Sequence, residues 1–80
     1  MIAYPIKVER REPKGIVVSF FDVPEATVVA DTEDDAYGFA IAALDQALTN
    51  YVAERRTLPE PSEISSAPTI TTYKFKLDNF

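Results

Sequence analysis

Acidic side chains form the densest chemical grouping in this 80-residue sequence. Asp31, Glu33, Asp34 and Asp35 follow one another with only Thr32 between them, and carboxylates grouped in this way can bind Mg²⁺ or Ca²⁺. Their spacing matches no calcium-binding loop, however, and the start of a helix attracts carboxylates because its dipole is positive there. We therefore interpret the cluster as a helix start, and we expect neither a metal site nor another cofactor.

Other groups that could perform catalysis are scarce. Asp22 follows a strand-like run, where the carboxylates of metal nucleases often lie, but a lone aspartate at a turn more often accepts backbone hydrogen bonds. The sequence has no histidine and no cysteine, so the commonest general bases, thiol nucleophiles and zinc ligands are missing. With Gly15 and Gly38 as its only glycines, a glycine-rich phosphate loop is excluded. The sequence predicts a binding module without catalytic residues.

Basic and aromatic residues alternate near the C-terminus. Lys74 and Lys76 alternate with Tyr73 and Phe75, and a strand that stacks bases and contacts phosphates would use such residues. Alternation places the lysines and the aromatics on opposite faces of a strand, so they cannot form one surface. An edge strand protected by lysines explains the pattern better, and we expect its aromatic face to be buried.

One long helix is predicted over residues 31–56, and the other elements must pack against it. Thr32 can cap its start with Asp35 in the capping-box position, and Arg55 and Arg56 suit the negative end of the dipole. A helix of about 24 residues would be ~36 Å long, so one end overhangs the domain or meets a partner. Its apolar stripe consists of Ala36, Ala40, Ala43, Leu44, Ala47, Leu48 and Tyr51.

Three further apolar residues, Phe39, Ile41 and Val52, widen this stripe beyond what one small sheet can cover. Exposed apolar patches usually mark interaction sites, and a chain this short gains stability from oligomerisation. We therefore expect these three residues to mediate a homodimer, since two-fold dimers are the commonest oligomers.

Four segments are predicted to be β-strands, at residues 2–12, 16–21, 26–30 and 69–78. The second is almost continuously apolar, which suggests a central strand covered on both faces, and turn residues 13–15 join it to the first as a hairpin. Pro5 requires either an edge position for the first strand or a nitrogen that faces away from its partner. The predicted fold is α+β: a three-stranded antiparallel meander, one long helix on one sheet face and a closing fourth strand, in the order β-β-β-α-β.

Charge and hydropathy narrow the range of partners. The formal net charge of −5 argues against nucleic acid, because phosphate contacts need concentrated lysine and arginine, and it suits a basic protein. No apolar run approaches the ~20 residues of a membrane span, and residues 1–7 lack the apolar core of a signal peptide. We expect a cytoplasmic protein without membrane contact.

The order and spacing of several short motifs resemble the N-terminal domain of HicB-type antitoxins. The run VSFFDVPE at residues 18–25 precedes ADTEDDA at residues 30–36, an Ala/Leu-rich helix and PEPS at residues 59–62. Glu25 and Ala30 stand where that family usually has glycine, and such replacements fit only where φ is negative. Asp35 stands where the family has glutamate.

This resemblance implies a partially degenerate RNase H-like fold that binds and neutralises a small basic HicA-type mRNA endonuclease. Residues 1–80 would form a single HicB-like domain, without the C-terminal DNA-binding domain of longer family members. Two alternatives remain open: a residual RNase H-like, metal-dependent nuclease that uses Asp22 and Asp31, and a nucleic-acid-binding regulatory module that acts as a dimer.

The loop formed by Asp22, Val23, Pro24 and Glu25 is the expected docking site for the partner. It joins two acidic groups to an apolar pair at a rigid turn, so that charge steers a basic protein and apolar contacts hold it. Lys7 and Glu9 on the uncovered sheet face are further candidates. The alternative is that this loop only turns the chain.

Overall fold

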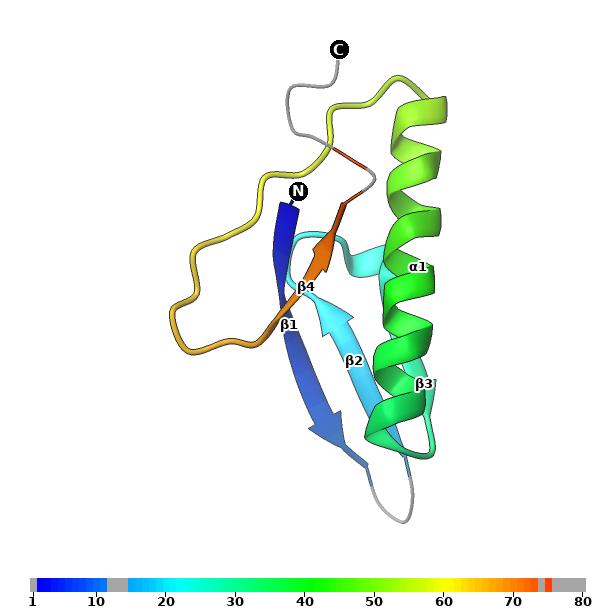
Figure 1. Cartoon of the computed structure of the whole chain (residues 1–80), viewed down its shortest axis with the longest axis vertical. Helices are drawn as coiled ribbons and strands as arrows, with labels where there is room; N and C mark the ends of the chain where they lie inside the picture. Colours follow the sequence, from blue (N-terminus) through cyan, green and yellow to red (C-terminus); the bar gives the residue numbers. More distant parts are fainter. Residues whose placement is uncertain (1, 12–14, 74, 76–80) are drawn as a thin grey trace.

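The structure, a computed structural model, describes residues 2–11, 15–73 and 75. Along them lie β1 (Ile2–Arg10), β2 (Ile16–Phe20), the 3-10 helix η1 (Pro24–Ala26), β3 (Val28–Ala30), α1 (Glu33–Ala53) and β4 (Thr69–Thr72). Figure 1 shows α1 running alongside the sheet, with the chain from its end returning as a long connection to β4. The α+β class and the strand–helix order predicted from the sequence are confirmed.

The strands form one antiparallel sheet in the order β3-β2-β1-β4. The predicted hairpin and meander are present, because β1 pairs with β2 from Ile6 opposite Phe20 to Arg10 opposite Ile16, and β2 pairs with β3. β4 pairs with the first half of β1 on its other side, over Ile2 to Pro5. Most of the hairpin turn lies outside the described residues, but Gly15 has a φ of 139°, which suits glycine.

Pro5 marks the point where β1 changes its main partner. The N–H of Phe21 donates to the Pro5 carbonyl at 3.4 Å, and in a complete antiparallel pair Pro5 would donate in return. Proline has no N–H, so the β1–β2 ladder ends here. β1 lies between β2 and β4, so it is not an edge strand. Pro5 is tolerated there because its nitrogen faces the end of β2, beyond the last paired residue Phe20.

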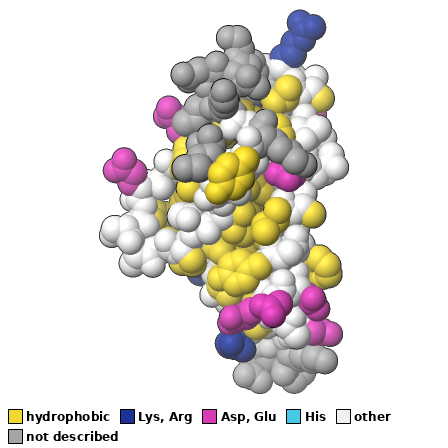
Figure 2. Space-filling view, in the orientation of Figure 1, with side chains coloured by type: hydrophobic (Ala, Val, Ile, Leu, Met, Phe, Trp, Pro, Cys, Tyr) yellow, Lys and Arg dark blue, Asp and Glu magenta, His cyan; other side chains and the backbone are white. Residues whose placement is uncertain are grey.

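The core lies between α1 and one face of the sheet. The largest completely buried side chains include Tyr4 and Ile6 of β1, Val18 of β2 and Leu44 and Leu48 of α1. On the face of the molecule seen in Figure 2, hydrophobic side chains lie over the middle and several acidic groups lie towards one end. All seven residues of the predicted stripe of α1 are buried or half-buried, so the helical periodicity identified the packed face correctly: Ala36, Ala40, Ala43, Leu44, Ala47, Leu48 and Tyr51.

The two ends of α1 are capped in different ways. At its start, the Thr32 hydroxyl accepts a hydrogen bond from the Asp35 backbone N–H at 3.2 Å, as predicted. At its end, the N–H groups of Arg55 and Arg56 donate to the carbonyls of Val52 and Tyr51, which is the Schellman arrangement. The two arginines were expected inside the last turn, but they follow the helix and build its cap instead.

All four strands are shorter than expected, and the third and the fourth differ most from their predicted ranges. The segment before β3 forms η1, because Pro24 favours the first turn of a helix and cannot join a ladder. In β4 the predicted faces were wrong: Ile70 and Thr72 are buried opposite Tyr4 and Ile2, whereas Tyr73 is 78% exposed at a bend. After this bend, the side chain of Phe75 is buried, as predicted for this aromatic residue. Lys74, Lys76 and the rest of the predicted strand lie outside the described residues.

Candidate functional site

Two of the short motifs, far apart in the sequence, meet at the end of β2. The Asp22 carboxylate accepts hydrogen bonds from the Ser62 backbone N–H at 2.8 Å and from the Ser62 hydroxyl at 2.6 Å. The sequence suggested a local turn role for Asp22, but its partner is 40 residues away. The aspartate thus fastens the chain that follows α1 to the loop that follows β2.

The connection over residues 57–68, here called the strap, is held at further points. The buried side chain of Leu58 enters the core, and the Tyr4 hydroxyl donates to the Pro59 carbonyl at 2.7 Å. The N–H of Ile6 donates to the Pro68 carbonyl at 2.9 Å. The strap is therefore a fixed part of the surface and not a free tether.

Aromatic and charged groups from three elements interact where α1 ends. The Arg56 guanidinium lies 4.0 Å from the centroid of the Tyr51 ring, and its Nε is 2.9 Å from a Glu54 carboxylate oxygen. Burial, together with a hydrogen bond to Glu25, raises the pKa of Tyr51. This hydrogen bond from the Tyr51 hydroxyl to Glu25 ties α1 to η1.

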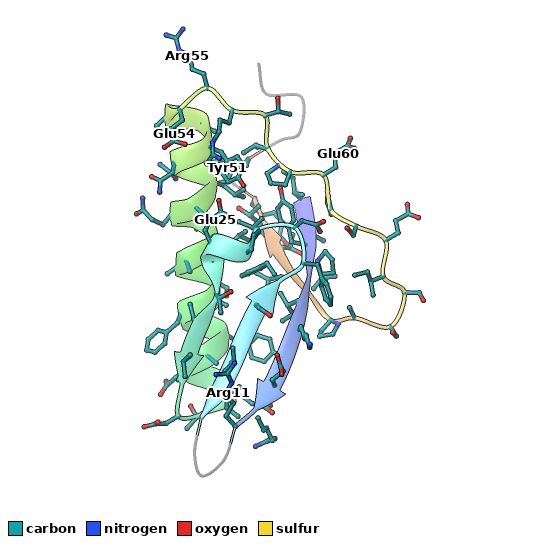
Figure 3. The ribbon with its side chains drawn as sticks, turned by 180° about the vertical axis from the view of Figure 1, so that it is seen from behind. Arg11, Glu25, Tyr51, Glu54, Arg55 and Glu60 are labelled. Carbon is teal, nitrogen blue, oxygen red and sulfur yellow. The ribbon has the colours of Figure 1, made fainter. Side chains whose placement is uncertain are left out.

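Carboxylates from several elements also lie in this half of the molecule, together with Arg55 and with Arg56, which pairs with Glu54. Figure 3 shows Glu25, Glu54 and Glu60 in the half opposite Arg11, projecting from η1, from the end of α1 and from the strap. All three are exposed, and Asp22 is half-buried beside Ser62. We call the surface of Asp22, Glu25, Glu54 and Glu60 the acidic end.

The predicted docking loop is only partly available to a partner. Pro24 and Glu25 are exposed, and Asp22 is half-buried, but Val23 has 0% exposure and belongs to the core. The expectation that Val23 contributes an apolar contact is therefore wrong for this conformation, because the η1 turn directs its side chain inwards. A Val23→Ala change would measure core packing instead of partner contact.

The face of the sheet away from α1 carries the other predicted partner residues. Lys7 and Glu9 are exposed there and form an ion pair of 3.7 Å, as the strand alternation indicated. Phe21 closes the predicted strand over residues 16–21, which was expected to be covered on both faces, yet it is 49% exposed. Its alternation with the buried Phe20 was the signal that could have placed it on the outer face.

The acidic cluster at the start of α1 forms a different surface. Arg10 of β1 donates to Glu33 at 2.8 Å, and within residues 2–11, 15–73 and 75 no group of three His, Cys, Asp or Glu side chains is arranged for a metal ion. Asp22 and Asp31 follow the ends of antiparallel strands, about 20 Å apart at the rise of a strand. The structure does not bring together the two carboxylates of the nuclease alternative.

The three residues expected to mediate self-association are exposed, but they do not form one patch. Phe39, Ile41 and Val52 are 54%, 49% and 39% exposed. At about 100° per residue, Phe39 lies on one flank of α1, and Ile41 and Val52 lie on the other. The buried stripe separates the two flanks. No helix within the described part of the chain is long and apolar enough to cross a membrane.

The protein is a small α+β domain in which one helix covers one face of a four-stranded antiparallel sheet. A family described as "HicB_like antitoxin of bacterial toxin-antitoxin system" matches residues 3–71. The chain belongs to this HicB-like antitoxin family.

Three curated relatives carry the same family name. "Antitoxin HicB 2" of Photorhabdus laumondii subsp. laumondii is 42% identical over 59 residues, which cover 74% of this chain and 42% of the relative. "Antitoxin HicB 1" of that organism is 36% identical over 61 residues, covering 76% and 39%. "Antitoxin HicB" of Pseudomonas fluorescens is 31% identical over 86 residues, covering 99% and 58%. The chain therefore spans between two fifths and three fifths of these relatives.

Proposed function

We propose that this domain is the toxin-binding part of an antitoxin and that it neutralises a small basic HicA-type mRNA endonuclease in the cytoplasm. The observation that carries the proposal is the family match over residues 3–71. The relatives named as HicB antitoxins align with at least 74% of the chain. On this proposal the domain acts by binding and is not an enzyme.

The distribution of charge supports a basic partner. The formal net charge is −5, and the acidic end presents exposed carboxylates on three elements that Tyr51 and the strap hold together. Charges arranged in this way accelerate the encounter with a basic protein. Pro24 and Phe21 are the exposed apolar residues of the adjacent loop and supply the contact that slows dissociation.

Co-expression tests neutralisation directly. Where expression of a HicA-type endonuclease from the same genome arrests growth, co-expression of this chain is expected to restore growth. A chain that accumulates in folded form but leaves the cells arrested would contradict the proposal.

Charge reversal tests the assigned surface. The double change Glu25→Lys with Glu60→Lys is expected to weaken toxin binding at least tenfold, as measured by calorimetry, because two attractive contacts become repulsive. Asp34→Lys with Asp35→Lys, on the exposed first turn of α1, is the matched control because it makes the same change in net charge, and it should change the affinity less than threefold. Circular dichroism confirms that the variants are folded. Equal losses for the two double variants would mean that only net charge matters, and a loss confined to Asp34→Lys with Asp35→Lys would move the site to the start of α1.

A further inference from the structure

β3 is an edge strand whose outer side offers hydrogen-bonding groups. The N–H of Arg11 donates to Gly15 and that of Phe21 donates to Pro5, so the odd-numbered residues of β2 direct their backbone groups towards β1. Its even-numbered residues face β3, where Ile16 and Val18 pair with Ala30 and Val28. Backbone groups alternate along a strand, so the N–H and C=O of Val29 point away from the sheet.

This edge carries no lysine and no proline, and its shortness, three residues, is its one protection by sequence against pairing with another strand. Natural sheets block exposed edges with lysine, proline, a bulge or a covering segment. The sequence of β3 is Val-Val-Ala, the side chain of Val29 is 62% exposed, and the sheet order leaves one side of β3 without a neighbouring strand among the described residues. An apolar edge of this kind favours association through strand pairing.

One flank of α1 extends the same surface. Asp45 accepts a hydrogen bond from Thr72 of β4 at 3.2 Å, so the flank with Ile41, Asp45 and Val52 faces the β4 side of the sheet. The flank that carries Phe39 therefore faces the β3 side. Asp35 begins this second flank one turn before Phe39. The rest of the flank has helical spacing and no charge, and it consists of Phe39, Ala42, Ala43, Gln46 and Asn50.

We propose that the β3 edge and the Phe39 flank of α1 form the interface of a two-fold homodimer. Val29 pairs with the same residue of a second copy, and Phe39 packs against its counterpart on the helix-covered side. An antiparallel hydrogen-bonded pair exchanges two N–H···O bonds, so a two-fold axis through Val29 satisfies both outward groups. The two sheets become one continuous sheet with both helices on the same face.

The dimensions of the fold agree with this arrangement. Phe39 lies about 9 Å along α1 from Glu33, and Val29 lies about 7 Å along β3 from Asp31, so both residues stand at a similar height above the turn that joins the two elements. Strands are spaced about 4.8 Å apart. A helix centred between β3 and β2 would therefore lie roughly 10 Å from its two-fold mate, within the usual distance for packed helices.

Charge favours a second copy as the occupant. Two molecules that each carry a net charge of −5 repel one another through most surfaces, since the acidic end and the start of α1 are both rich in carboxylates. Beyond Asp35 in the first turn of α1, the Phe39 flank contains no charged residue, and neither does the Val28–Ala30 edge. Interface centres are depleted of charge, and this is the surface on which like-charged copies can approach. The inference concerns self-association and stands independently of any toxin.

Sedimentation equilibrium of the full chain tests the interface with three lysine variants. Val29→Lys and Phe39→Lys place unpaired charges at the two-fold axis and should weaken dimerisation at least tenfold. Ile41→Lys is the matched control because it makes the same charge change at a similarly exposed site on the other flank, and it should alter the dimer constant less than threefold. A monomeric native chain at about 200 μM, or dissociation by Ile41→Lys alone, would overturn the proposal.

Cross-linking gives a readout that does not depend on weakening the dimer. The sequence has no cysteine, so a single introduced thiol can be oxidised cleanly. Hydrogen-bonded antiparallel residues have Cα atoms about 5.5 Å apart, within the range of a disulfide. Val29→Cys should give mostly disulfide-linked dimer under mild oxidation, and Ile41→Cys should not. The reverse pattern would assign the interface to the other flank.

Discussion

Tyr4 combines complete burial with a polar group that must be satisfied. Its hydroxyl donates to the Pro59 carbonyl at 2.7 Å, and its side chain has 0% exposure. Burial, and then the charge of Asp22, raises the pKa of Tyr4 from 10.0 to about 12. The folded state therefore favours the protonated phenol more strongly than the unfolded chain does.

This shift predicts a loss of stability at alkaline pH. The folded pKa lies above the unfolded value, so the stabilisation is complete below pH 10 and disappears as pH rises from about 10 to about 12. The free energy of unfolding should fall by roughly 2–3 kcal/mol across this window. Urea titrations at several pH values measure the change.

Tyr4→Phe is the matched control for that titration. It should cost about 1–3 kcal/mol at neutral pH, because the Pro59 carbonyl loses its donor, but it should flatten the alkaline decline. Tyr51 would account for the remaining slope, since its pKa is also raised. An equally steep decline in Tyr4→Phe would show that another group titrates.

At the residue level, sequence reasoning identified local chemistry better than long-range contacts. The Thr32 cap follows from residue type and spacing alone. The Asp22–Ser62 contact joins positions 40 residues apart, and no periodic pattern reports such a pairing. The burial of Val23 was missed because a loop valine next to a proline carries no face signal, and the η1 turn that buries it is a tertiary feature.

Among the elements, α1 ends with a conformation that its sequence does not favour. Arg55 has a φ of 58°, the only positive value among described residues other than glycine. The left-handed conformation costs an L-residue roughly 1–2 kcal/mol, and helices usually place glycine at this position. Glu25 and Ala30 have no positive φ, so the absence of the family's glycines there creates no backbone conflict.

Arg55→Gly is therefore expected to stabilise the domain. The free energy of unfolding should rise by about 1 kcal/mol, because the left-handed cost is relieved and is only partly offset by the flexibility of glycine in the unfolded chain. Glu54→Gly is the adjacent control: its φ is −89°, so glycine should destabilise there by about 0.5–1 kcal/mol. Chemical denaturation of both variants provides the measurement. If both variants changed the free energy of unfolding in the same direction, the conformational cost assigned to Arg55 would be contradicted.

Element type and order were predictable because the amphipathic period of α1 and the apolar run of β2 are strong local signals. The choice of which face of β4 is buried was not predictable in this way. An alternating strand has two possible phases, and the correct one is set by its register on β1, with Ile70 opposite Tyr4. The bend at Tyr73 then changes the phase before Phe75, which strict alternation cannot represent.

For the whole molecule, the central position of β1 decides how the sheet is assembled. One side of β1 pairs with β2, its neighbour in the chain, and the other side pairs with β4, which arrives only after α1 and the strap. The β1–β2–β3 meander and α1 are thus joined by short connections. β4 closes the largest loop in the fold, and ordering a long loop is an entropic cost that the four β4–β1 pairs must offset.

Native-state hydrogen exchange should therefore separate two opening reactions on a single strand. The N–H of Ile6 donates to Pro68, the last residue of the strap before β4, whereas the N–H of Lys7 faces Ser19 of β2. Release of the strap and β4 frees the first amide and leaves the second protected, so Ile6 should exchange with a smaller opening free energy than Lys7. Equal opening energies measured by NMR would mean that the domain opens only as a unit. Adjacent amides of β1 thus report, respectively, a partial detachment of the C-terminal region and the unfolding of the whole sheet.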